Sequence, residues 1–147
     1  MTPVVPPSVP GALTGAEPDL GASTGCTVLL ADDNSDAAIT LTMWLKMKGH
    51  QVHIASTGLQ ALSLAHQWAP EVAILDIGLP DIDGYEVARR LRVELPADEM
   101  PLLIALTGWG QAQDRLHALD AGFDHHMTKP APLPELEALL LTRFRAE

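Results

Sequence analysis

Short apolar segments alternate with segments of helical periodicity from residue 26 onward, and this alternation restricts the fold more than any other feature. The expected strands cover residues 26–31, 51–55, 72–75, 102–106 and 123–128, and the expected helices cover about 36–48, 58–68, 84–95, 111–121 and 133–144. Strands separated by helices are parallel, because a parallel pair needs a long crossover, and right-handed crossovers place helices on both faces of the sheet. The pattern predicts an α/β domain with a five-stranded parallel sheet.

Residues 1–25 have a different character from the rest of the chain. They are rich in proline and glycine, contain no lysine or arginine, and have no apolar periodicity. Such a segment cannot bury enough apolar surface to offset the entropy lost on ordering. We therefore expect a flexible tail or linker over residues 1–25 and one domain with a substantial core over residues 26–147.

Two apolar stripes run along the expected helix at residues 36–48, which Asn34 or Ser35 can cap. The expected core stripe consists of Ala38, Leu41 and Leu45, and the second stripe consists of Ile39, Met43 and Met47. A helix with one buried side needs only one stripe. This helix is therefore either wedged between the sheet and a neighbouring helix, or it offers the second stripe to a partner. On the expected helix at residues 111–121, one apolar face consists of Ala112, Leu116 and Leu119.

Composition excludes several classes of protein. A net charge of −10 and a pI near 4.8 repel phosphodiester backbones, and three arginines at positions 89, 90 and 92 are too few for a basic patch, so we expect no nucleic-acid binding by this chain. Cys26 is the only cysteine, which rules out an internal disulfide and indicates a reducing compartment. The sequence has no apolar run of about 18 residues and no signal-peptide pattern, so we expect a cytoplasmic protein without direct membrane contact.

Polar residues whose side chains can bind ions or react follow four of the five expected strands. Asp32 and Asp33 follow the first strand, Asp76 the third, Thr107 the fourth and Lys129 the fifth. The carboxyl ends of parallel strands lie on one edge of a sheet, where open α/β sheets form their binding crevice. The sequence therefore predicts that three carboxylates, a hydroxyl and an ammonium converge.

Three neighbouring carboxylates need a cation, since two of them about 4 Å apart repel by about 4 kcal/mol at an effective dielectric near 20. A site made of oxygen ligands favours a hard divalent ion, most simply Mg²⁺. With two carboxylates on the metal, Asp76 can act as a nucleophile toward a phosphoryl group. Mg²⁺, Lys129, Thr107 and N–H groups of the loop at Gly78 would neutralise the phosphoryl oxygens. The predicted reaction is phosphoryl capture on Asp76 followed by loss to water.

From Cys26 to Arg145 the chain resembles the receiver domain of two-component response regulators. The resemblance is carried by the motifs V-L-L-A-D-D-N (28–34), V-A-I-L-D-I-G-L-P-D-I-D-G-Y-E-V (72–87), I-A-L-T-G (104–108) and H-H-M-T-K-P (125–130). It implies a flavodoxin-like (βα)5 fold with the strand order 2-1-3-4-5 and helices on both faces. It places a receiver domain at residues 26–147.

The resemblance also implies a role for each site residue. By this likeness, Asp76 is the phosphoacceptor, Asp33, Asp76 and the backbone carbonyl of Gly78 bind Mg²⁺, Asp32 acts through water, Thr107 is the switch hydroxyl, and Lys129 binds phosphate before the cis-proline position, here Pro130. The family often has Tyr or Phe three residues before the lysine, and this chain has His126. We keep His126 as a switch residue, with an imidazole in place of the usual aromatic ring. Trp109 is predicted to prolong the phosphorylated state by limiting water access, so Trp109→Ala should speed phosphate release.

The expected function is phosphorelay signalling. A histidine kinase or a histidine phosphotransfer domain would donate to Asp76, slow self-dephosphorylation would follow, and the domain would catalyse only its own phosphotransfer and dephosphorylation as a monomer or weak dimer. The proline-rich leader also suits a receiver from a hybrid sensor kinase. One alternative is a phosphatase of the haloacid dehalogenase type, but that chemistry needs a second Asp where Gly78 stands. Another is an interaction module with a vestigial site.

Overall fold

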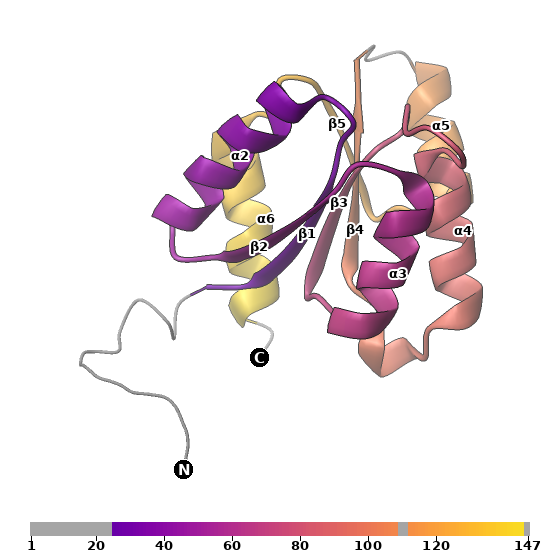
Figure 1. Cartoon of the computed structure of the whole chain (residues 1–147), viewed down its shortest axis with the longest axis horizontal. Coiled ribbons are helices and arrows are strands. Elements are labelled where there is room, and N and C mark those ends of the chain that lie inside the picture. Colours follow the sequence, from indigo (N-terminus) through magenta and orange to yellow (C-terminus); the bar gives the residue numbers. More distant parts are fainter. Residues whose placement is uncertain (1–24, 109–111, 146–147) are drawn as a thin grey trace.

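The described residues of the computed structural model, 25–108 and 112–145, form one parallel sheet with helices on both faces (Figure 1). The strands are β1 (Thr27–Ala31), β2 (Gln51–Ala55), β3 (Val72–Asp76), β4 (Leu102–Thr107) and β5 (His125–Thr128). The helices are α2 (Ser35–Met47), α3 (Gly58–Trp68), α4 (Gly84–Glu94), α5 (Ala112–Ala121) and α6 (Leu133–Arg145), with a 3-10 turn η2 (Ala97–Glu99). The strand order is β2-β1-β3-β4-β5, which confirms the predicted fold and order.

Two apolar cores lie on opposite faces of the sheet because neighbouring residues of a strand point to opposite sides. In β1, Leu29 packs into the core beneath α3, α4 and α5, whereas Leu30 packs into the core beneath α2 and α6. Figure 1 shows the same division of the helices between the two faces. Since β3 is central and all of its residues are buried, a continuous apolar run was the correct signal for it.

Helix α2 begins where its sequence provides a cap. The side chain of Asn34 accepts a hydrogen bond from the N–H of Ala37, and Asp36 lies in the first turn near the positive end of the helix dipole. The core stripe is buried as predicted at Ala38 and Leu45, with Leu41 partly buried. The helix therefore starts immediately after the polar loop that carries Asp32 and Asp33.

The exposed apolar residues differ from the predicted pattern on α5. Leu116 and Leu119 are 62% and 53% exposed, while Ala118 and Ala121 are buried against the sheet. The two leucines of the predicted apolar face are therefore exposed, and this helix packs on the sheet through its smaller alanines. Within the described residues, no helix has the length and apolar character needed to cross a bilayer.

Candidate functional site

Three carboxylates meet at the carboxyl edge of the sheet. Strands β1 and β3 are adjacent and pair Ala31 with Leu75, so Asp32 and Asp76, the next residues on each strand, come side by side. One carboxylate oxygen from each of Asp32, Asp33 and Asp76 lies within 4.8 Å of the other two. Asp32 and Asp76 are buried and Asp33 is exposed. The structure thus brings together the three acidic residues that the sequence singled out.

Lys129 is the cation that the fold places among these carboxylates. Its Nζ lies 2.8 Å from Oδ2 of Asp76 and 3.2 Å from Oδ2 of Asp32. The lysine follows β5, its backbone N–H donates to the carbonyl of Thr107 at 2.7 Å, and the Lys129–Pro130 peptide bond is cis, as the resemblance implied. One ammonium against three carboxylates leaves a local excess of negative charge.

The loop backbone after each strand binds the remaining carboxylate oxygens. The N–H of Asn34 donates to Oδ1 of Asp32 at 2.9 Å, and the N–H of Gly78 donates to Oδ1 of Asp76 at 3.0 Å. These hydrogen bonds fix the orientation of both carboxylates. In each case Lys129 contacts the other oxygen, Oδ2.

Burial and charge shift two pKa values in this cluster. Burial raises the pKa of Asp32, and the negative charge of Asp76 adds to the effect, although the N–H of Asn34 and Lys129 oppose it. Burial acts to lower the pKa of Lys129, but the hydrogen bond and charge of Asp76 and the charge of Asp32 outweigh it, so the pKa lies above its ordinary value. Lys129 is therefore charged at neutral pH, and the buried Asp32 carboxylate lacks full compensation.

Thr107 and His126 lie beside each other on adjacent strands. Thr107 ends β4 and is 5% exposed, and its Oγ1 lies 3.0 Å from Nε2 of His126 on β5. The imidazole thus occupies the position where the family often has an aromatic ring, and it contacts the Thr107 hydroxyl directly. Trp109 falls outside the described residues.

An apolar pocket of about 540 Å³ opens next to this cluster. Its lining includes Asp32 and Lys129 of the cluster, together with apolar side chains of α2 and the start of α6, among them Leu41, Trp44 and Leu133. The pocket is not among the features that the strand-end pattern predicts. Its only sequence signal was Trp44, a large aromatic residue that belongs to neither predicted stripe of the helix.

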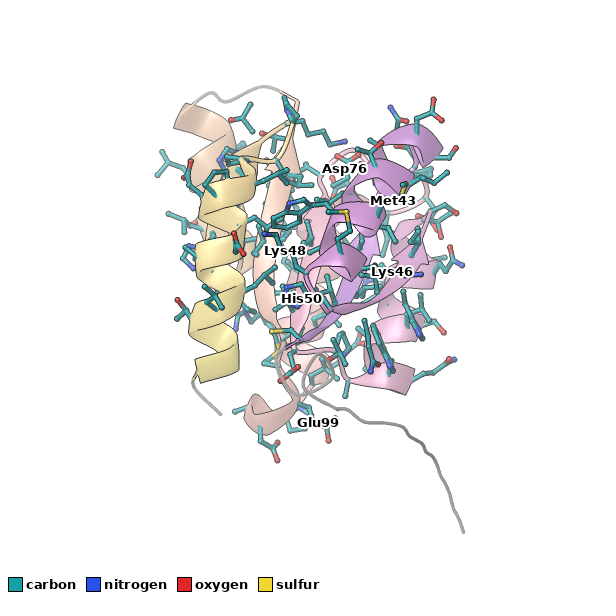
Figure 2. The ribbon with its side chains drawn as sticks, turned by 90° about the vertical axis from the view of Figure 1, so that its left-hand side faces the viewer. Met43, Lys46, Lys48, His50, Asp76 and Glu99 are labelled. Carbon is teal, nitrogen blue, oxygen red and sulfur yellow. The ribbon has the colours of Figure 1, made fainter. Side chains whose placement is uncertain are left out.

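The second apolar stripe of α2 faces solvent. Ile39, Met43 and Met47 are 52%, 62% and 79% exposed. The alternative in which α2 is wedged between the sheet and a neighbouring helix, with both stripes buried, is therefore wrong. Figure 2 shows Met43 on the side of α2 away from the sheet, toward the end of the molecule where Asp76 lies.

Comparison with known proteins identifies the class of this domain. The family model for the response regulator receiver domain matches residues 28–141. Transcriptional regulatory protein KdpE of Mycobacterium tuberculosis is 40% identical over 118 residues, which cover 80% of this chain and 50% of that protein. CreB of Escherichia coli, also a transcriptional regulatory protein, is 39% identical over 119 residues, covering 81% of this chain and 51% of its own length. The chain thus spans about half the length of these relatives.

A solved structure points to the same class. The receiver domain of sensor histidine kinase PA1611 from Pseudomonas aeruginosa is similar with a TM-score of 0.74 and 29% identity, over 82% of this chain and 98% of that one. That structure has a magnesium ion coordinated in its active-site cleft. The fold and the acidic cluster define an α/β signalling domain, and the chain belongs to the response regulator receiver domain family of two-component systems.

Proposed function

We propose that this receiver domain accepts a phosphoryl group on Asp76 from a phosphohistidine and then loses it slowly to water, switching a protein-interaction surface in between. The observation that supports this most is the 2.8 Å contact of Lys129 Nζ with Asp76 Oδ2, inside a cluster with two further carboxylates. A buried carboxylate at a strand end, with a cation beside it and an open approach past an exposed Asp33, suits a nucleophile.

In the transfer step, a carboxylate oxygen of Asp76 forms a P–O bond as the N–P bond of the donor breaks. The donor imidazole leaves with the electron pair and takes up a proton. Lys129 moves from Asp76 Oδ2 to a phosphoryl oxygen, and the Thr107 hydroxyl donates to another. In the dephosphorylation step, water attacks phosphorus and the Asp76 carboxylate leaves. This step restores the unphosphorylated site and releases inorganic phosphate.

The residues present fit a magnesium ion. Asp33, Asp76 and the Gly78 carbonyl would hold it and Asp32 would bind it through water, because the cluster offers hard oxygen ligands and carries more negative charge than Lys129 offsets. When bound, Mg²⁺ would supply positive charge to the phosphoryl oxygens during transfer. The raised pKa of Asp32 supports this assignment, since a buried carboxylate without sufficient cationic partners favours any added cation.

The donor is a histidine kinase or a histidine phosphotransfer domain, and we propose that it docks over α2. The stripe of Ile39, Met43 and Met47 is exposed on the helix that begins directly after Asp32 and Asp33, and the apolar pocket opens on another side of the same helix. Apolar side chains of a donor would find both a flat surface and a recess beside the acceptor. The net charge of −10 disfavours a nucleic-acid partner for these residues.

Incubation with acetyl phosphate and Mg²⁺, followed by intact-mass spectrometry, tests the proposal. We expect the mass of one phosphoryl group to be added to the wild type and to be lost in Asp76→Asn. Asp98→Asn on the surface turn η2 is the matched control and should be phosphorylated like the wild type. Turnover of many phosphomonoesters would instead support a phosphatase, and the absence of any adduct in the wild type would support a vestigial site.

A further inference from the structure

The side chain of Asp81 links the loop between β3 and α4, residues 77–83, to the start of α3, beside a longer hydrogen bond of 3.4 Å from the N–H of Gly58 to the carbonyl of Pro80 in the same loop. Oδ1 of Asp81 accepts the N–H of Gly58 at 2.9 Å, and Oδ2 accepts the N–H of Leu59 at 3.3 Å. These are N–H groups of the first turn of a helix, which have no partner within the helix. The loop thus reaches across to a helix that is remote from it in the chain.

The local structure is shaped for this contact. A Cβ atom on Gly58 would lie 2.2 Å from the carbonyl oxygen of Ile82, so only glycine lets the loop lie directly on the helix. Asp81 itself has a φ of 67°, a left-handed conformation that Asp tolerates better than most residues. Desolvation is the largest single influence on the pKa of Asp81 and raises it, but the hydrogen bonds from the N–H groups of Ile82, Gly58 and Leu59 and from the Thr57 side chain together outweigh it and hold the pKa below the ordinary value.

Helix α3 has its own cap without Asp81. Oγ1 of Thr57 accepts the N–H of Gln60 at 3.1 Å, and Oε1 of Gln60 accepts the N–H of Ser56 at 2.8 Å. This reciprocal pair is the arrangement of a capping box. The helix start is therefore already stabilised, and the part that gains most from Asp81 is the loop.

The loop begins at the acceptor site. The N–H of Gly78 holds Oδ1 of Asp76, Leu79 is buried in the core, and the N–H of Gly84 closes the loop by donating to the carbonyl of Ile77 at 2.9 Å. Asp81 lies between these two ends. Its contact with α3 links the middle of the loop to a different element of the fold.

We propose that Asp81 is a positioning residue that holds the 77–83 loop, and with it Gly78 and the Asp76 carboxylate, in the arrangement that binds the metal ion. The inference rests on the proposed function in one respect, the assignment of Asp76 and Gly78 as ligands. If the clamp keeps most molecules in the competent conformation, its loss raises the apparent dissociation constant by the inverse of the competent fraction. By linkage, metal binding must in turn tighten the clamp on Gly58 and Leu59.

The test compares Asp81→Gly and Asp81→Asn with the wild type and with Asp98→Asn as an equal change in charge. Glycine accepts the backbone conformation of position 81 and has no acceptor, whereas Asn accepts that conformation and retains one side-chain carbonyl oxygen. Calorimetric titration with Mg²⁺ should give a dissociation constant about three- to tenfold higher in Asp81→Gly, an intermediate value in Asp81→Asn, and the wild-type value in Asp98→Asn. Far-UV circular dichroism should be the same in all four proteins.

A second measurement separates positioning from helix capping. In the wild type, Mg²⁺ should slow amide hydrogen exchange of Gly58 and Leu59 more than that of Gln60, which Thr57 caps. In Asp81→Gly this selective protection should disappear at Leu59 and decrease at Gly58, which still donates to the carbonyl of Pro80. Equal Mg²⁺ affinity in Asp81→Gly and the wild type, or exchange at Gly58 that ignores Mg²⁺, would overturn the role of Asp81 and leave the proposed function intact. Wild-type protein that binds no Mg²⁺ would overturn both.

Discussion

Asp32 lies in an environment that is unfavourable to its own charge. It is 4% exposed and lies beside Asp76, and it shares the single ammonium of Lys129 with that residue. Its pKa is raised mainly by burial, so the folded protein binds a proton at Asp32 more readily than the unfolded chain does. The free energy of unfolding therefore decreases as the pH rises from the ordinary pKa of an aspartate through the raised value. At neutral pH the whole of this loss of stability is present.

Asp32→Asn should stabilise the metal-free protein at pH 7. The change removes a buried charge and one carboxylate repulsion, and we expect a gain on the order of 1–2 kcal/mol in the free energy of unfolding. Urea unfolding in the presence of a chelator measures it, and the gain should shrink as the pH is lowered toward 4. A less stable variant at pH 7 would mean that the contact with Lys129 outweighs the desolvation of Asp32.

The predictability of single residues depended on where they stand relative to the strands. Asp32, Asp76 and Thr107 could be found from the sequence because each ends or directly follows an apolar strand, and Lys129 because it follows the last expected strand; parallel topology brings such positions together. Asp81 could not be found this way. Its partners are backbone N–H groups of α3, which have no sequence signature, and the side chain itself resembles an ordinary turn residue.

Apolar periodicity determines which residues share one face of a helix, but not where that face points. On α2 it identified both stripes correctly, while the exposure of Ile39 and Met43 required the packed structure. On α5 it favoured two leucines over the alanines that contact the sheet. Strands were easier to predict, because burial on both faces leaves a continuous apolar run.

The substitution Met43→Glu on α2 should affect docking of the phosphohistidine donor without affecting the chemistry at Asp76. A charge in the centre of the exposed stripe should slow transfer from a cognate phosphohistidine donor by about tenfold or more, since one central interface residue can contribute over 1 kcal/mol. Phosphorylation by acetyl phosphate needs no docking and should be unchanged. The matched control is Leu119→Glu, which places the same charge at an exposed position of α5, a helix on the other face of the sheet. Equal slowing of both donors by Met43→Glu would contradict a docking role.

At the scale of the whole molecule, the acceptor site is a product of sheet assembly. Its side chains come from β1, β3, β4 and β5, which are neighbours in the sheet although they span most of the domain sequence. The predicted (βα)5 order was sufficient to bring them to one edge, but not to show which carboxylate oxygen Lys129 contacts or that α3 helps to hold the loop. Those details depend on the conformations of the loops, which the order of strands and helices does not determine.

Lys129 directly follows one of the two edge strands of the sheet. Strand β5 has four residues and pairs only with β4, so its local opening requires far less free energy than unfolding of the domain. In rising urea, the rate of adduct formation with acetyl phosphate should therefore decline before far-UV ellipticity does; coincident curves would contradict this. Loss of phosphorylation before global unfolding would make signalling sensitive to mildly denaturing conditions. Local opening of one edge strand would displace the Lys129 ammonium while the rest of the domain stays folded.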